Sequence, residues 1–179
     1  MKTTKRLIVW GLIIVLALTV LVAMQFTSEV QWNEAGAYIV ILLVVGGLFE
    51  LWQWLKTRGK TYRIAFGIGV AGVFLLGWVS GADGIIGSEN NPVNLMYWAV
   101  PIVGVIGSLI SRFHSRGMGR TLFMMAVVQF LIPVVALILS PEVSWGSAGV
   151  TGVFVANSIF AALFASSGLL FLRATREHN

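Results

Sequence analysis

The stretch KTRGKTYRIAFGIGVAGVFLLGWVSGA, residues 56–82, contains the pattern that decides the fold. Four Lys and Arg residues lie within its first eight positions, whereas the following segment, residues 64–82, carries no charged side chain. A helix needs about 20 mostly apolar residues to cross a hydrocarbon core about 30 Å thick. The stretch therefore predicts one membrane-spanning helix that follows a basic loop.

Five further apolar stretches accompany this one. Together the six cover residues 7–26, 36–55, 64–82, 93–110, 121–139 and 149–172. Their continuous apolar character, without period-two alternation, favours helices over a β-barrel. The links between them are short, so consecutive helices should be antiparallel neighbours. We predict an all-α, polytopic membrane bundle of six transmembrane helices that forms a single domain over residues 1–179.

The charged residues predict how this bundle is oriented. All 12 Lys and Arg residues fall in four clusters that the six spans place on one side: Lys2, Lys5, Arg6; Lys56, Arg58, Lys60, Arg63; Arg112, Arg116, Arg120; and Arg173, Arg176. The segments on the other side carry acidic residues only. Because basic residues stay cytoplasmic during insertion, we predict an inner-membrane-type protein with both termini in the cytoplasm. Its first partner is then the lipid bilayer.

Composition excludes several classes of protein. The chain is 58% hydrophobic and only 11% charged, whereas a soluble domain has about 25% charged residues. The net charge of +5 reflects the short basic loops beside the spans, so we expect no nucleic-acid partner. The chain has no Cys, which excludes disulfides, thiolate metal sites and Cys nucleophiles.

The segments predicted on the outer face hold the candidate binding residues. These are Glu29, Trp32, Asp83, Glu89, Asn91, Asn94, Trp98, Glu142 and Trp145. They also have a structural interpretation, because Trp anchors helices at the headgroup zone and acidic outer loops follow from the topology. The oxygens of the 83–94 loop are of the type that binds divalent cations, but their spacing is not that of an EF-hand. We predict no metal site.

Three polar residues lie within the predicted spans: Glu50, Gln129 and Asn157. A carboxylate inside a span is costly. Glu50 is therefore either a structural partner of Arg63 or Lys56, which we favour, or a protonatable group in a transport path. The two amides are first interpreted as hydrogen bonds between helices, and a polar cavity lined by both is the alternative.

Small residues and prolines predict how the helices pack. The third span has Ala65, Gly69, Gly77 and Gly81 on a four-residue spacing, with Gly67, Ala71 and Gly72 alongside. The sixth has Ala161 and Ala165 beside a stripe of Ser158, Ala162 and Ser166. Such faces let backbones approach closely in lipid. We expect these two helices to be central or to lie at a subunit interface. Pro101 and Pro133 should kink the fourth and fifth spans, and Pro133 also deprives the Gln129 carbonyl of its usual helical donor.

A faint repeat relates two outer loops. Glu29-Val30-Gln31-Trp32 aligns with Glu142-Val143-Ser144-Trp145, and both segments join an outward-going helix to an inward-going one. Duplication of a helical hairpin is one explanation, since internal repeats are common in membrane bundles. Chance similarity between apolar sequences is the other explanation.

Three segments of the chain resemble a family of small bacterial multi-spanning membrane proteins without an assigned activity. They are residues 24–32, residues 61–65 and residues 84–97, and the likeness extends over about residues 20–120. The resemblance implies a bacterial source and no catalytic role, and it draws attention to the motifs of the outer face.

The sequence leaves two classes of function open. We predict no enzyme, no catalytic residue and no cofactor. The serines within the spans have no His or Lys at their depth to activate them, and the chain contains no catalytic sequence motif. One class is a small permease or channel for a neutral or small solute, possible for six short helices that form a homo-oligomer. The other is a non-transporting accessory, scaffold or lipid- or quinone-binding subunit that presents an acidic, Trp-rich outer face to a membrane partner.

Overall fold

The computed structural model describes residues 2–26, 32–88, 90–140 and 144–177, without the side chains of residues 2, 23–26, 32–35 and 37. The elements are α1 (Lys2–Phe26), α2 (Trp32–Leu55), α3 (Lys60–Ala82), the 3₁₀ helix η1 (Pro92–Trp98), α4 (Ala99–Ile110), α5 (Ser115–Leu139) and α6 (Gly149–Arg176). The described ranges contain no strand, and six of their helical stretches, with η1 and α4 counted as one, are long and apolar enough to cross a membrane. This confirms the all-helical prediction with six candidate spans.

Four helices begin earlier than the sequence predicts. α1 begins at Lys2 rather than at residue 7, and α2 begins at Trp32 rather than at residue 36. α3 begins at Lys60 rather than at residue 64, and α5 begins at Ser115 rather than at residue 121. Hydropathy marks only the apolar part of a helix, whereas the backbone hydrogen bonds continue through the polar residues before it. The basic residues at these positions therefore belong to helices and not to loops.

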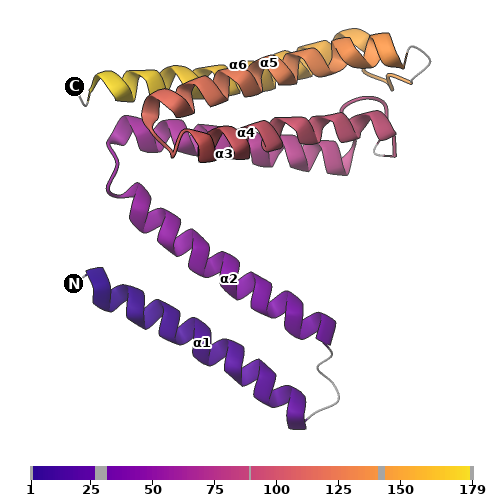
Figure 1. The fold of residues 1–179 in the computed structure, drawn as a ribbon. Helices are drawn as coiled ribbons and strands as arrows, with labels where there is room; N and C mark the ends of the chain where they lie inside the picture. Colours follow the sequence, from indigo (N-terminus) through magenta and orange to yellow (C-terminus); the bar gives the residue numbers. More distant parts are fainter. Residues whose placement is uncertain (1, 27–31, 89, 141–143, 178–179) are drawn as a thin grey trace. The chain divides into compact units, whose positions relative to one another are not determined.

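The chain divides into two compact units, Met1–Arg58 and Gly59–Asn179. Unit 1 is the hairpin of α1 and α2, whose axes run side by side (Figure 1). The two helices approach at Gly46, where an added Cβ would lie 2.9 Å from Ile13 Cδ1 and 3.0 Å from Trp10 Cη2. Among the described side chains of this unit, Ile13 and Leu42 are the buried apolar ones, so most of its apolar surface is exposed.

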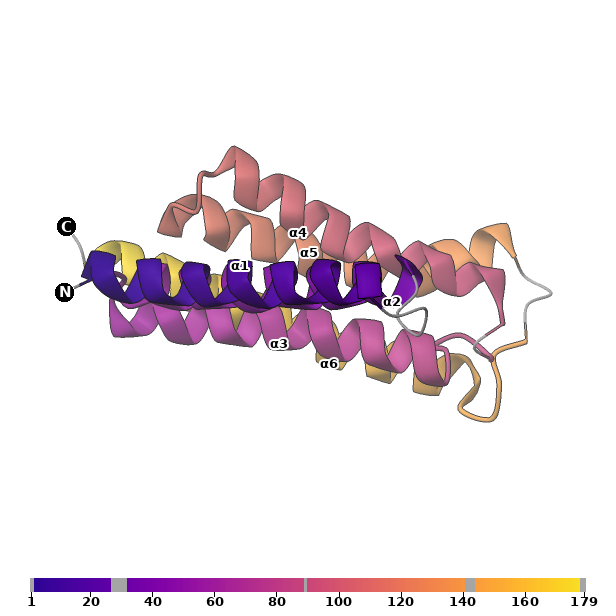
Figure 2. The same cartoon turned by 90° about the horizontal axis from the view of Figure 1, so that it is seen from below.

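Unit 2 is a bundle in which α3 packs on α6, α6 on α5, and α5 on α4 (Figures 1 and 2). The short η1 contacts α3, α4 and α5. Contacts between small residues allow the close approaches within the bundle. An added Cβ at Gly119 of α5 would lie 3.1 Å from the Gly168 carbonyl oxygen of α6, and one at Gly107 of α4 would lie 2.5 Å from Thr121 Cγ2 of α5.

The α3–α6 interface uses faces that the sequence predicts only in part. Gly69 and Gly72 of α3 are buried against α6, where a Cβ at Gly72 would lie 2.8 Å from Phe164 Cε1. The Ser167 hydroxyl donates to the Ala65 carbonyl oxygen at 2.7 Å. The central position of both helices agrees with the prediction, but the predicted faces are partly wrong, because open space surrounds Gly77 and Gly81.

On α6 the packing face is also displaced from the predicted stripes. The buried residues from Val153 to Ala174 include Phe164, Ser167, Gly168 and Phe171, whereas Ser158, Ala162 and Ser166 are exposed. A spacing of four residues marks every face of a helix equally well, so it cannot select the face by itself. The large Phe side chains and the buried Ser167 select it here.

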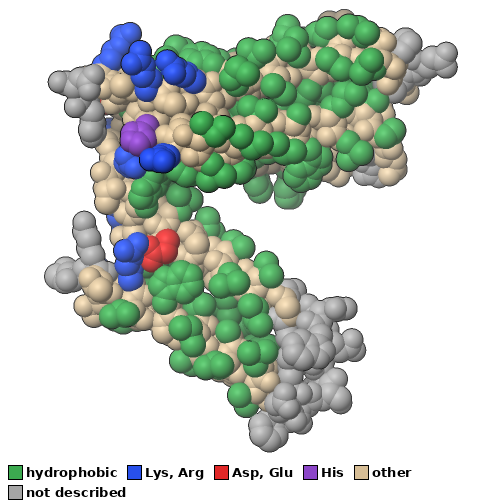
Figure 3. Space-filling view, viewed as in Figure 1, with side chains coloured by type: hydrophobic (Ala, Val, Ile, Leu, Met, Phe, Trp, Pro, Cys, Tyr) green, Lys and Arg blue, Asp and Glu red, His purple; other side chains and the backbone are tan. Residues whose placement is uncertain are grey.

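The two ends of unit 2 differ in charge. The basic end, where α3 and α5 begin and α6 ends, carries Lys60, Arg63, Arg112, Arg116, Arg120, Arg173 and Arg176 (Figure 3). At this end Tyr62 of α3 donates its hydroxyl proton to the Phe113 carbonyl oxygen at 2.8 Å, which ties α3 to the turn between α4 and α5. The opposite end, the loop end, comprises the described loop residues 83–88, 90–91 and 144–148.

Candidate functional site

A groove of about 860 Å³ lies between α3 and η1 at the loop end of unit 2, and we call it the α3–η1 groove. Its main walls are Phe74, Gly77 and Trp78 of α3 and Leu95, Tyr97 and Trp98 of η1. The volume is within the range of about 300–1,000 Å³ that is typical of ligand pockets. No Lys, Arg, His, Asp or Glu is among the described residues that line it. The described lining is therefore apolar and aromatic, with an uncharged polar component.

Glycines of α3 create the space. Gly77 and Gly81 both line the groove, and a Cβ added at either position would meet no atom within 4 Å. A larger residue at Gly77 would therefore project into open volume rather than into a packed neighbour. Because no atom lies near Gly77 and Gly81, these residues make no close contact with another helix and instead form the floor of the groove.

The 3₁₀ winding of η1 determines which of its side chains are buried and which are exposed. Pro92 begins the helix, and the Asn91 side chain caps it by accepting a hydrogen bond from the Val93 N–H at 3.1 Å. Because a 3₁₀ helix has three residues per turn, positions i and i+3 share a face. Asn94 and Tyr97 are accordingly buried, at 6% and 2% exposed, whereas Leu95 and Trp98 are 67% and 65% exposed.

Asn94 fastens the preceding loop to η1. Its side-chain oxygen accepts from the backbone N–H groups of Ile85 (3.1 Å) and Ile86 (2.9 Å), and its NH₂ group donates to the carbonyl oxygens of Ile86 (3.2 Å) and Ser88 (2.8 Å). A side-chain amide has two donor protons and two acceptor sites, so all are used. Asn91 donates to the Ile86 carbonyl oxygen as well, at 2.9 Å. The geometry favours a structural role for both amides over cation binding.

Two glycines let this loop turn. Gly84 and Gly87 have φ angles of 74° and 75°, a region that favours glycine. A Cβ at Gly84 would lie 2.5 Å from the Ser88 carbonyl oxygen, and one at Gly87 would lie 2.3 Å from the Ser144 carbonyl oxygen. The close approach at Gly87 brings the two loops of the loop end into contact.

A buried pair of amides lies beside the groove. Gln129 of α5 donates from Nε2 to Asn157 Oδ1 of α6 at 2.9 Å, and Asn157 Nδ2 donates to the Tyr97 hydroxyl oxygen at 2.9 Å and to the Val153 carbonyl oxygen at 2.8 Å. Gln129 and Asn157 are both fully buried. Tyr97 therefore belongs both to the groove wall and to a polar cluster that joins η1, α5 and α6.

The hydrogen bonds fix the orientation of both amides. The Val153 carbonyl can only accept, so the NH₂ group of Asn157 must face it and the Asn157 oxygen must face Gln129. Gln129 must then present its own NH₂ group, which leaves its Oε1 without a donor among the described residues. Both protons of Asn157 Nδ2 are used, one of them by Tyr97, so the Tyr97 hydroxyl is an acceptor in this cluster.

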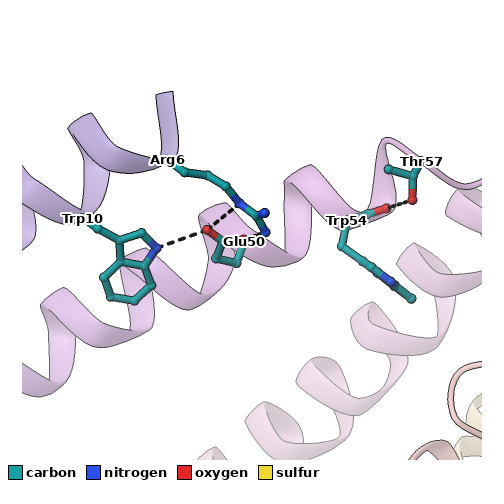
Figure 4. Close-up of polar contacts among 5 residues, drawn as sticks. All are labelled: Arg6, Trp10, Glu50, Trp54 and Thr57. Atoms are coloured by element: carbon teal, nitrogen blue, oxygen red, sulfur yellow. Dashed lines mark hydrogen bonds and ion pairs between the residues drawn. The ribbon is translucent and has the colours of Figure 1, made fainter. Parts of the chain in front are cut away.

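Glu50 lies in a different cluster, within unit 1. Arg6 of α1 forms an ion pair with it and donates from Nε to Glu50 Oε1 at 3.0 Å, and Trp10 donates from Nε1 to the same oxygen at 3.1 Å (Figure 4). A structural ion pair agrees with the favoured sequence interpretation, but the partner differs from Arg63 and Lys56. Hydropathy places Arg6 at the start of the first span, and only the antiparallel α1–α2 pairing brings it beside Glu50.

The predicted outer-face residues separate into three groups. Asn91, Asn94 and Trp98 line the groove, together with Tyr97, Trp78 and Gly77, which the sequence analysis did not select as site residues. Asp83 is exposed after α3, and Trp145 is half-buried before α6. Glu29, Glu89 and Glu142 and the side chain of Trp32 lie outside the described residues. The three-residue spacing from Asn94 to Tyr97 after Asn-Pro is the signal that could have identified Tyr97.

The repeated Glu-Val-x-Trp segments lie mostly outside the described residues as well. The parts that are described differ, because Trp32 is the first residue of α2, whereas Trp145 lies four residues before Gly149, the first residue of α6. The duplication stays a prediction.

The chain matches no protein-family model, and its comparison with curated proteins and with solved structures also finds no match. The resemblance of residues 20–120 to small bacterial membrane proteins stays a prediction.

Proposed function

We propose that this chain is a non-enzymatic, multi-pass protein of a bacterial inner membrane, with both termini cytoplasmic, and that it binds a neutral amphiphile in the α3–η1 groove. The charge difference between the two ends of unit 2 supports the orientation, because it matches the cytoplasmic retention of basic residues. In this orientation the loop end and the groove belong to the outer leaflet.

The observation that carries the proposal is the uncharged, aromatic lining of the groove. An apolar tail fits against Phe74, Leu95 and Trp98, and the amide of Asn90 lies at the polar component. An anionic headgroup would need a cation, and none is present among the described lining residues. Neutral lipids and isoprenoid-type molecules are therefore the favoured class, which is the lipid- or quinone-binding alternative from the sequence.

The test fills the groove by a substitution at Gly77. Purified protein in phosphatidylcholine nanodiscs is titrated with brominated dioleoylglycerol, whose bromine atoms quench nearby Trp fluorescence, and with brominated phosphatidylglycerol as the anionic comparison. We expect stronger quenching by the neutral glyceride. Gly77→Leu should abolish the difference, because its side chain fills the groove.

Gly67→Leu is the matched control. Gly67 lies on the same helix, also has open space around it and does not line the groove. This variant should keep the preference for the neutral glyceride. Equal quenching by the two lipids in the wild-type protein, or an unchanged preference in Gly77→Leu, would contradict the proposal.

A second candidate function is a permease for a neutral solute, and one observation favours it. Gln129 Oε1 is buried and has no donor among the described residues, as a solute-binding carbonyl would be in an empty state. Large side chains such as Phe164 and Leu76 fill the interior around the bundle axis, so binding has more geometric support than permeation. Release of a neutral polyol from liposomes that contain the protein, abolished by Gln129→Leu, would favour the permease.

A further inference from the structure

We infer that the α3–η1 groove selects amphiphiles whose head carries a hydrogen-bond-accepting carbonyl, and that Tyr97 donates the selecting proton. The inference rests on the proposed function, since it names the chemical class of ligand for the same groove. It follows from the direction of the hydrogen bonds in the cluster of Tyr97, Asn157 and Gln129.

The first step is the state of Asn157. Its Oδ1 accepts from Gln129, and its two Nδ2 protons go to the Val153 carbonyl oxygen and to the Tyr97 hydroxyl oxygen. A carbonyl oxygen cannot donate, so this arrangement cannot be inverted. Asn157 therefore acts on Tyr97 only as a donor.

The second step is the state of the Tyr97 hydroxyl. Its oxygen accepts from Asn157, and within the described part of the chain it makes no other hydrogen bond. Its own proton has consequently no acceptor on the protein side. A buried donor without an acceptor is costly, and a ligand acceptor would remove that cost.

The third step is the position of Tyr97. It lines the groove together with Trp78 of α3 and Trp98 of η1, and it is 2% exposed. Tyr97 lines this groove and not the second cavity, which lies between α5 and α6. We therefore assign the acceptor for the Tyr97 proton to the occupant of the groove.

These three steps specify the head of the ligand. It must accept a hydrogen bond, it must be uncharged because the described lining has no cation, and it must tolerate flanking aromatic rings. A carbonyl on a flat, neutral ring, as in a benzoquinone with an alkyl tail, meets all three requirements. A hydrocarbon of the same shape meets the last two only, which makes it the informative comparison.

The experiment measures displacement of tritiated decylbenzene from the full-length protein in nanodiscs. Unlabelled decylbenzoquinone should displace it from the wild-type protein at a concentration about five- to tenfold lower than unlabelled decylbenzene does, which corresponds to one net hydrogen bond. In Tyr97→Phe the two compounds should displace it at the same concentration. Saturable retention of tritiated decylbenzene, above that of nanodiscs without protein, shows that the variant is folded.

The outcomes separate this inference from the proposed function. Saturable retention of decylbenzene without preference for the quinone, or a preference that survives Tyr97→Phe, would overturn the inference and leave a groove for neutral amphiphiles. Absence of retention in the wild-type protein would overturn both. If Tyr97→Phe does not fold, the infrared carbonyl band of decylbenzoquinone on the wild-type protein decides. It should lie at a lower frequency than in dodecane, and an unshifted band would overturn the inference.

Discussion

The α1–α2 hairpin and the α3–α6 bundle consist of helices of similar apolar character that pack very differently. At most 11% of the residues in each candidate span of the hairpin are buried, against 22–39% in the spans of the bundle. The bundle has glycines at its contacts and amides in its interior, whereas the hairpin has one glycine contact and an exposed ion pair. Apolar composition makes a helix able to enter lipid, but small residues and buried amides create a packed interior.

The largest effect on the packing difference between the bundle and the hairpin is expected when a glycine contact is removed from the bundle. Gly72→Leu places a side chain where a Cβ alone would lie 2.6 Å from Leu163 Cδ2. Overpacking should force α3 away from α6 and lower the free energy of unfolding by about 3 kcal/mol. The measurement is helix loss by circular dichroism during unfolding in mixed detergent micelles.

Gly67→Leu is the control for this substitution as well, because it makes the same change on the same helix without a close neighbour. Its stability should stay within about 1 kcal/mol of the wild type, since glycine in a helix interior is itself unfavourable. Equal losses in the two variants would mean that helix propensity, and not the α3–α6 contact, determines stability.

The next largest effect is expected from the buried amides. Asn157→Leu leaves Gln129 Nε2 without its acceptor and the Tyr97 hydroxyl without its donor. Unfolding by the same assay should require about 2 kcal/mol less. Ser158→Ala is the matched control, because Ser158 is exposed and bonds only to the Phe154 carbonyl oxygen of its own helix. A wild-type stability for Asn157→Leu would show that the cluster does not support the bundle.

The smallest effect is expected in the hairpin. Glu50→Gln removes the charge that Arg6 pairs with and keeps an acceptor for Trp10. The side chains of Arg6 and Glu50 are 55% and 27% exposed, so the loss should be small and confined to this unit. Amide hydrogen exchange should become faster in α1 and α2 and stay unchanged in α5 and α6. Thr19→Val, which alters a hydroxyl bonded within α1, should change neither. Faster exchange in α5 or α6 would contradict the separation of the two units.

The sequence predicts the helices well and the site only in part. Hydropathy identifies each candidate span because charge and apolar length are read directly from the chain. The sequence identifies Asn91, Asn94 and Trp98 as candidates, but their spacing does not show that Asn94 points inward and Trp98 outward. That division depends on the 3₁₀ winding of η1, which Asn-Pro suggests but does not determine.

Pairings between distant residues were the least predictable part. Glu50 meets Arg6 and not a nearer cation, and Gln129 meets Asn157 through the rotation of α5 against α6. A four-residue repeat of small residues does not show how a helix is rotated about its axis relative to its neighbour. The sequence therefore predicts Gly77 at a helix contact, whereas open space surrounds it in the structure. The volume of the side chains on the facing helix decides between a contact and open space. The sequence of one helix does not show which side chains of the other helix face it.

The 3₁₀ winding of η1 also determines depth. A 3₁₀ helix rises about 2.0 Å per residue against about 1.5 Å for an α-helix. Five steps from Pro92 therefore carry Tyr97 about 10 Å along the axis, whereas α-helical winding would carry it about 7.5 Å. The difference is about the length of a hydrogen bond. The larger rise per residue thus brings the side chain of Tyr97 to the level of the Asn157 amide on α6. The hydrogen bonds of a 3₁₀ helix have poorer geometry, so this added length is gained at a cost in helix stability.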